Sequence, residues 1–141
     1  MKIILLIIMG ISILNADYTK NGDIVIDSLS GVQWQDDISD HLMTWENAIP
    51  YCETLILGGH SDWRLPNINE LQSIVDRSEI NPAIAAGFTN TSTNAYYAYW
   101  TSTTLEIPNK DYTWVIYFSS GYVNYTGKKY ERNVRCIRDG Q

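Results

Sequence analysis

Cysteine and histidine are the residue types of this chain that could hold a metal, exchange a disulfide or act as a base beside a nucleophile. Cys52 and Cys136 do not form a Cys-x-x-Cys pair, and His41 and His60 lie apart. Neither a zinc site nor a redox-active pair is therefore expected. No Ser or Cys nucleophile motif adjoins either histidine, and we expect both to be ordinary loop residues. The sequence thus predicts a protein that is not an enzyme.

Carboxylates are the other side chains with ligand chemistry. Glu106 and Asp111 could supply oxygen ligands to calcium. The cluster of several carboxylates that such a site requires is missing, so we expect no metal and no other cofactor.

Aromatic side chains are more concentrated near the end of the chain than a core requires. Between 96 and 130 the tyrosines and tryptophans are Tyr96, Tyr97, Tyr99, Trp100, Tyr112, Trp114, Tyr117, Tyr122, Tyr125 and Tyr130. On alternating strands about half of these rings face away from the core, and exposed rings with polar tips are typical of binding surfaces. We predict a platform for a neutral polar ligand such as a glycan, formed by Tyr97, Asn109, Asp111, Tyr117, Tyr122 and Asn124. The alternative is a β-rich core with amphipathic surface side chains.

The register of the 112–125 hairpin decides which rings are exposed, because successive side chains of a strand alternate. The side chains expected to point inward are Trp114, Ile116 and Phe118. Those expected to point outward are Thr113, Val115 and Tyr117, together with either Tyr122 and Asn124 or Val123 and Tyr125 on the return strand. The segment from 87 to 111 borders this hairpin and is expected to be long and irregular, as functional loops often are.

The segment Asp62-Trp63-Arg64 combines two opposite charges with a large apolar ring. Because a buried charge needs a partner, we expect a structural polar cluster here rather than a ligand site. Arg135 and Arg138 flank Cys136. We expect one of these arginines to pair with a carboxylate inside the molecule.

Hydrophobic periodicity predicts the elements that position these side chains. The expected elements are a hairpin of 23–27 and 32–35, helices over 44–57 and 67–77, and strands over 99–103, 112–118, 122–125 and 133–138. Gly58-Gly59 is expected to end the first helix. If Thr44 caps that helix, Pro50 lies inside it; if Asn47 does, Pro50 falls in the first turn. Asn67 and Glu70 have the spacing of a capping box. The class is α+β with a mainly antiparallel sheet.

The N-terminus indicates export. Lys2 precedes an apolar run over 3–14 that is too short to span a bilayer but suits a signal peptide. We predict cleavage after Ala16, one domain over 17–141, a periplasmic or secreted location, and no membrane span after cleavage. An uncleaved anchor is the alternative. An even cysteine count in an oxidising compartment favours a Cys52–Cys136 bridge. The net charge of −6 argues against nucleic acid as a partner.

Five segments in order resemble the Lcl C-terminal domain family, a bacterial domain of unknown function named after the end of a collagen-like adhesin. They are Ser30–Gln35, Thr44–Ala48 with Tyr51-Cys52, Asp62–Asn67 with Glu70-Leu71, Tyr99–Thr103 and Val134–Arg138. The resemblance implies a C-type lectin-like fold, in which two helices pack on one side of a small sheet. It also implies a disulfide from the first helix to the last strand, where Cys52 and Cys136 fall.

Together these features predict an exported ligand-binding module, adhesin-like or associated with the cell envelope, whose partner is a glycan or another surface protein. The alternative is a structural or interaction subunit of a secreted assembly. The lectin-like superfold also includes oxidases of the formylglycine-generating type. Those enzymes need active thiols, which a Cys52–Cys136 bridge would not leave.

Overall fold

A computed structural model describes residues 15–38 and 40–140 of the chain. The predicted signal peptide lies outside this part except for its last two residues. The elements are β1 (Tyr18–Asn21), β2 (Ile24–Asp27), β3 (Gln33–Gln35), α1 (Trp45–Thr54), α2 (Ile68–Ser73), β4 (Tyr99–Ile107), β5 (Lys110–Tyr117), β6 (Tyr122–Gly127) and β7 (Ile137–Arg138). No helix in the described ranges is long and apolar enough to cross a membrane.

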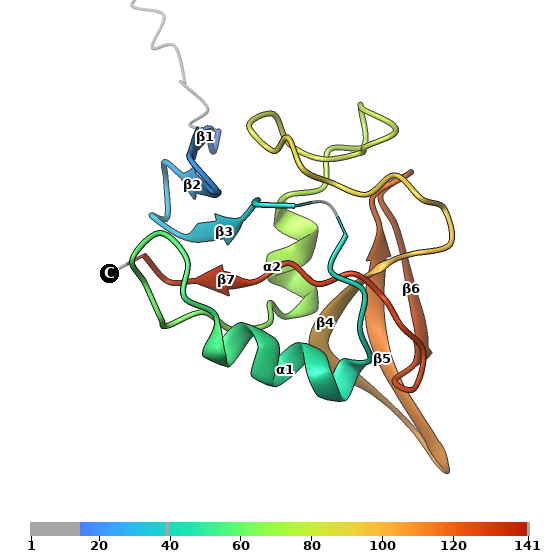
Figure 1. Ribbon diagram of the computed structural model, residues 1–141. Coiled ribbons are helices and arrows are strands. Elements are labelled where there is room, and N and C mark those ends of the chain that lie inside the picture. Colours follow the sequence, from blue (N-terminus) through green and yellow to red (C-terminus); the bar gives the residue numbers. More distant parts are fainter. Residues whose placement is uncertain (1–14, 39, 141) are drawn as a thin grey trace, which may run out of the picture.

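Two antiparallel sheets replace the single sheet that was expected (Figure 1). The first has the order β1-β2-β3-β7 and joins the two ends of the chain; the second is the meander β4-β5-β6. The α+β class is confirmed, and so are both hairpins. The predicted strand over 133–138 shrinks to β7, and β1 was not predicted. The segment expected to be irregular from 87 to 111 in fact contains all of β4 and the start of β5.

The first helix is shorter than its apolar periodicity suggests. Thr44 is its N-cap residue and Pro50 lies inside it, as in the first of the two alternatives. Gly58 and Gly59 do not end the helix. Both have positive φ and form a tight turn in which Leu57 and His60 exchange backbone hydrogen bonds of 3.0 and 3.1 Å. Paired left-handed residues suit such a turn, which explains the glycines.

The second helix begins as predicted and ends early. The side chain of Asn67 accepts a hydrogen bond from the Glu70 amide, and the Glu70 carboxylate accepts one from the Asn67 amide, so the capping box is complete. The helix stops at Ser73 rather than Arg77. Beyond it Val75 forms an isolated β-bridge with Ile84.

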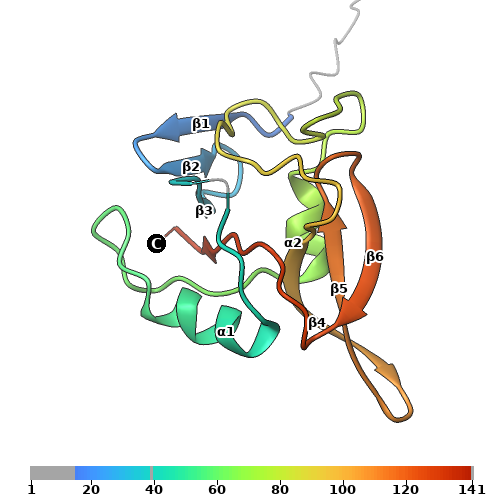
Figure 2. The ribbon, with the colours of Figure 1, turned by 45° about the vertical axis from the view of Figure 1, so that its right-hand side comes forward.

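The helices lie against opposite faces of the β4-β5-β6 sheet, not on one side of it (Figures 1 and 2). Ala48 and Cys52 of α1 share a core with Trp100 and Val115. A second core holds α2 and the adjoining strand positions; its members include Leu71, Ile74, Tyr99, Ile116 and Phe118. Because neighbouring strand residues point to opposite faces, these two cores sandwich β4 and β5. The inner part of the sheet is therefore buried on both sides.

Candidate functional site

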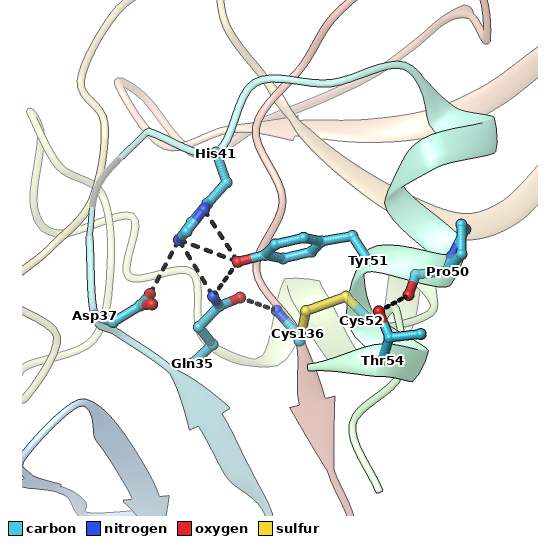
Figure 3. Close-up of a disulfide and its surroundings, with 8 residues drawn as sticks. All are labelled: Gln35, Asp37, His41, Pro50, Tyr51, Cys52, Thr54 and Cys136. Atoms are coloured by element: carbon cyan, nitrogen blue, oxygen red, sulfur yellow. Dashed lines mark hydrogen bonds and ion pairs between the residues drawn. A yellow bond between two sulfur atoms is a disulfide. The ribbon is translucent and has the colours of Figure 1, made fainter. Parts of the chain in front are cut away.

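A disulfide joins α1 to the residue immediately before β7, which confirms the bridge predicted from compartment and cysteine count (Figure 3). The Cα atoms of Cys52 and Cys136 are 5.5 Å apart and 84 positions apart in sequence. Both residues are fully buried. Within the described residues no free cysteine remains. The bridge occupies the thiols that an oxidase of the formylglycine-generating type would need.

A polar network beside the disulfide connects four segments (Figure 3). Gln35 accepts a hydrogen bond of 3.0 Å from the Cys136 amide and donates one of 2.8 Å to the Tyr51 hydroxyl. His41 Nδ1 lies 3.0 Å from that hydroxyl, and His41 Nε2 lies 3.0 Å from Asp37 Oδ1. When Nε2–H donates to Asp37 and Nδ1 accepts from Tyr51, the contacts of His41 with Asp37 and Tyr51 are both hydrogen bonds, and the 3.2 Å contact of its Nε2 with the Gln35 amide nitrogen is not. His41 is thus more than the ordinary loop residue that its polar sequence context suggested.

The electrostatics of this network follow from its burial. Burial raises the pKa of the Tyr51 hydroxyl, and the hydrogen bond from Gln35 offsets this only in part. Burial would also raise the pKa of Asp37, but hydrogen bonds from His41 and from the Ile38 amide outweigh it, so that pKa is lowered. The network links β3, the segment of Asp37 and His41, α1 and Cys136 through side-chain hydrogen bonds.

The residues of the Asp62-Trp63-Arg64 segment each bind a different part of the chain. Trp63 is buried, and its indole N–H donates to the carbonyls of Leu57 and His60 at 3.3 and 3.2 Å. Asp62 accepts two hydrogen bonds from Arg138, at 2.6 and 3.1 Å. Arg64 donates two to the Glu70 carboxylate, at 2.8 and 2.7 Å, and one to Asp139. The segment therefore connects α2 to the C-terminal strand.

Glu70 should make stability depend on pH. Burial would raise the pKa of its carboxyl, but hydrogen bonds from Arg64 and the Asn67 amide outweigh burial and lower it below the ordinary 4.5. A carboxylate whose pKa is lowered in the folded state stabilises the protein above its unfolded-state pKa. This stabilisation is lost as the pH falls through the folded-state pKa. We expect Glu70→Gln to destabilise by about 1 kcal/mol at pH 7 and to flatten the stability–pH curve below about 4.5. Urea titrations from pH 3 to 7 measure this, with the exposed Glu53→Gln as control; parallel curves for the two variants would contradict it.

A second charged cluster centres on a fully buried pair beneath the loop that leads to β4. The side chains of Asp36 and Arg135 are 0% and 2% exposed, with Oδ1 and Nη1 at 3.2 Å. Asp36 also accepts hydrogen bonds from the amides of Thr89 and Asn90, at 3.0 and 3.2 Å, and pairs with Lys20. Arg135 lies over the ring of Phe88. The expectation that an arginine beside Cys136 pairs with an internal carboxylate is met by Arg135.

The predicted ligand platform divides into two places. Tyr117, Tyr122 and Asn124 line one open hollow of about 490 Å³ at the turn of the β5–β6 hairpin. Asn109 and Asp111 lie at the other end of β5, about 20 Å away at the usual rise of a strand. There Asp111 pairs with Lys128 at 2.7 Å. Tyr97 does not line the hollow; its backbone carbonyl accepts from the Asn133 side chain.

The hollow contains residues that the sequence argument missed. Its remaining lining consists of Ala95, Tyr96, Ser119, Ser120 and Arg132. Tyr96 and Tyr122 are 81% and 61% exposed, the two most exposed aromatic side chains of the described chain. Tyr96 stood in the aromatic run of the sequence, but its alternation pattern gave no sign that a loop would carry this ring to the hairpin turn.

The predicted hairpin register was wrong for three residues. Ile116 and Phe118 are buried as expected. Trp114 is only partly buried and packs edge-on against Tyr125 on the outer part of the sheet. Thr113 and Val115 are fully buried rather than outward. Val115 belongs to the core that α1 covers. The Thr113 hydroxyl donates to the carbonyls of Thr101 and Thr103, in the part of β4 where the register with β5 shifts.

The carboxylates considered for calcium lie opposite each other on β4 and β5, as the pair Glu106 and Asp111. No group of three or more His, Cys, Asp or Glu side chains that could hold a metal occurs in the residues 15–38 and 40–140.

Comparison with known proteins places this geometry in a class. The chain matches the Lcl C-terminal domain over residues 23–138, which include both sheets from β2 onward and the disulfide. The protein belongs to the Lcl C-terminal domain family, as its five motifs suggested. No curated protein matches the chain.

Proposed function

We propose that this domain is an exported binding module that holds a neutral polar ligand, such as a glycan, in the hollow at the turn of the β5–β6 hairpin. The observation that carries the proposal is the convergence of three predicted ligand residues with Tyr96 on one concave surface. Binding without catalysis fits this site, because its lining holds hydroxyls, an amide and a guanidinium but no carboxylate or thiol.

The chemistry of the hollow suits a sugar ring. A volume of about 490 Å³ lies within the range typical of small-molecule sites. The exposed rings of Tyr96 and Tyr122 offer apolar faces for the C–H groups of a pyranose and hydroxyls at their edges. Asn124, Ser119 and Ser120 add neutral donors and acceptors. An uncharged hydroxylated ligand matches all of these groups.

Export is part of the proposal. The apolar run over 3–14 is typical of a signal peptide, and β1 begins at Tyr18, soon after the predicted cleavage point. A buried disulfide fits an oxidising compartment such as the periplasm or the exterior. We propose a C-type lectin-like domain in an adhesin or an envelope-associated protein.

A structural subunit of a secreted assembly is the second candidate. It is favoured by the half-buried ring of Tyr112 and the exposed ring of Tyr125, whose centroids lie 5.6 Å apart outside the hollow and which could serve a protein partner. A glycan array separates the two candidates, because a structural subunit has no need of sugar binding.

We expect Tyr122→Ala to weaken binding of the best-bound neutral oligosaccharide of an array at least about tenfold, because it removes one of the two exposed rings of the hollow. Titration calorimetry with that oligosaccharide measures the change. Tyr125→Ala is the matched control: it removes an exposed ring from the opposite face of the same strand. No binding to any neutral oligosaccharide, or equal losses for both variants, would refute the proposed site.

A further inference from the structure

The outer edge of β6 is the open border of the second sheet. β6 pairs with β5 on one side only, and in Figure 2 no other segment lies beside its outer edge. Its residues, Tyr122 to Gly127, include no charged residue and no proline. Exposed edges of this kind can pair with another strand, and proteins usually protect them with charges, prolines or covering segments.

The other sheet borders of the described chain are protected in that way. The first half of β4 is covered because the Trp100 and Ser102 amides donate to the carbonyls of Asn133 and Pro66. Its second half carries Glu106 and ends before Pro108. In the other sheet, β7 exchanges backbone hydrogen bonds with Arg64, and β1 is short and carries Lys20. The stretch of β6 from Val123 to Tyr125 has none of these protections.

The backbone groups that face this edge can be identified. The Lys128 amide donates to the Asp111 carbonyl at 3.1 Å. The backbone N–H and C=O groups of the even-numbered residues in this strand therefore point toward β5. The Tyr125 amide instead donates to the Asn124 side chain at 2.8 Å and so points outward. Val123 shares this orientation. Three outward backbone groups have no backbone partner outside the strand ladder within the described residues. They are the Val123 amide, the Val123 carbonyl and the Tyr125 carbonyl. The Gly127 carbonyl is already engaged by the Tyr130 amide at 3.2 Å.

We infer that β6 pairs antiparallel with β6 of a second copy of this chain, about a two-fold axis at Asn124. Val123 of one protomer then lies opposite Tyr125 of its partner. This pair exchanges two backbone hydrogen bonds, and the two-fold axis generates a second, identical pair. The Gly127 carbonyl keeps its hydrogen bond from the Tyr130 amide. The Asn124 side chain leaves the Tyr125 amide and meets its own copy across the axis. A second copy is the fitting partner because an uncharged strand facing itself brings no like charges together.

The arrangement has a consequence for ligand binding, which rests on the proposed function. A two-fold axis perpendicular to the sheet keeps both copies of Tyr122 and Asn124 on the same face. The two hollows then open in one direction, and a repetitive glycan could occupy both, with a gain in avidity. The pairing itself needs no ligand, so its test is independent of the glycan proposal.

Proline substitution at the edge tests the pairing. Tyr125→Pro removes the outward amide but no hydrogen bond to β5, and edge strands tolerate proline at such positions. Tyr125→Ala removes the same ring and keeps the amide. In sedimentation velocity from about 5 to 500 μM, we expect the 17–141 protein and Tyr125→Ala to form dimers and the dissociation constant of Tyr125→Pro to rise at least about tenfold. Circular dichroism spectra of both variants should match the parent protein.

Two results would overturn the inference: a parent protein that stays monomeric throughout this range, or a Tyr125→Pro variant that dimerises as tightly as Tyr125→Ala. If Tyr125→Pro loses its native spectrum, Val123→Pro and Val123→Ala provide the same comparison at the other outward position, with the same two outcomes.

Discussion

Cys52→Ala is expected to lower the melting temperature of the 17–141 protein by about 15 °C or more. The bridge closes a loop that spans 84 positions. Chain entropy assigns about 4–5 kcal/mol to a loop of that length. For a domain of this size each kcal/mol corresponds to a few degrees of melting temperature. Since small domains have only about 5–15 kcal/mol of stability in total, the loss is a large part of it. Differential scanning calorimetry at pH 7 measures the change.

The parent protein in a reducing agent is the control for this substitution. Reduction removes the covalent link but keeps both side chains in the core. Both samples should therefore melt at similar temperatures, with Cys52→Ala slightly lower because it also loses a buried sulfur. A melting temperature within about 3 °C of the oxidised parent protein would show that the link contributes little. Two reactive thiols in the native protein would contradict the bridge itself.

Asp36→Ala is expected to destabilise by about 3–5 kcal/mol, because it leaves Arg135 buried without its charge partner. It also leaves the amides of Thr89 and Asn90 without the acceptor that holds their loop. Urea denaturation measures the loss. Binding of a ligand in the hollow should weaken as well, because this loop continues to Ala95 and Tyr96, which line the hollow.

A double-mutant cycle separates the charge pair from ordinary packing. If Asp36→Ala destabilises mainly because it leaves the Arg135 charge uncompensated, the double variant Asp36→Ala with Arg135→Met should lose less unfolding free energy than the sum of the two single variants. The difference should be at least about 1 kcal/mol. Asp111→Ala is the matched surface control. Its carboxylate is 73% exposed and pairs with Lys128, so a change within about 1 kcal/mol is expected. Additive effects in the cycle would show that the pair is not coupled.

Local signals in the sequence predicted the elements that depend on neighbouring residues. The capping box of Asn67 and Glu70 sets the start of α2 by contacts three residues apart, and both hairpins follow from alternation and turn residues. The extent of α1 was not predictable in this way. Its apolar period continues past Thr54, but the backbone leaves the helix at Leu55 and turns at Gly58 and Gly59. Helical periodicity reports which residues are apolar, not where tertiary packing ends the helix.

The candidate site was predictable only in part, because it depends on contacts between distant segments. Tyr117, Tyr122 and Asn124 came together because one hairpin carries them. Tyr96 and Arg132 reach the same hollow from outside that hairpin. The loop that carries Tyr96 is fixed through Asp36 and Arg135, which lie near opposite ends of the chain. Thr113 and Val115 were predicted to be exposed because an alternating pattern implies that one face of the sheet is exposed to solvent. The helices in fact cover both faces of this sheet.

The position of the disulfide also determines how the domain responds to mechanical force. A pull on the two chain ends can extend only the residues outside the Cys52–Cys136 loop, because the covalent bond withholds the 84 positions between them, about 290 Å of extended chain. Every lining residue of the hollow, from Ala95 to Arg132, lies inside that loop. Tension on an anchored molecule would therefore peel away β1, β2 and β3 first. The segment that carries the tyrosine-lined hollow would stay closed by the disulfide under load.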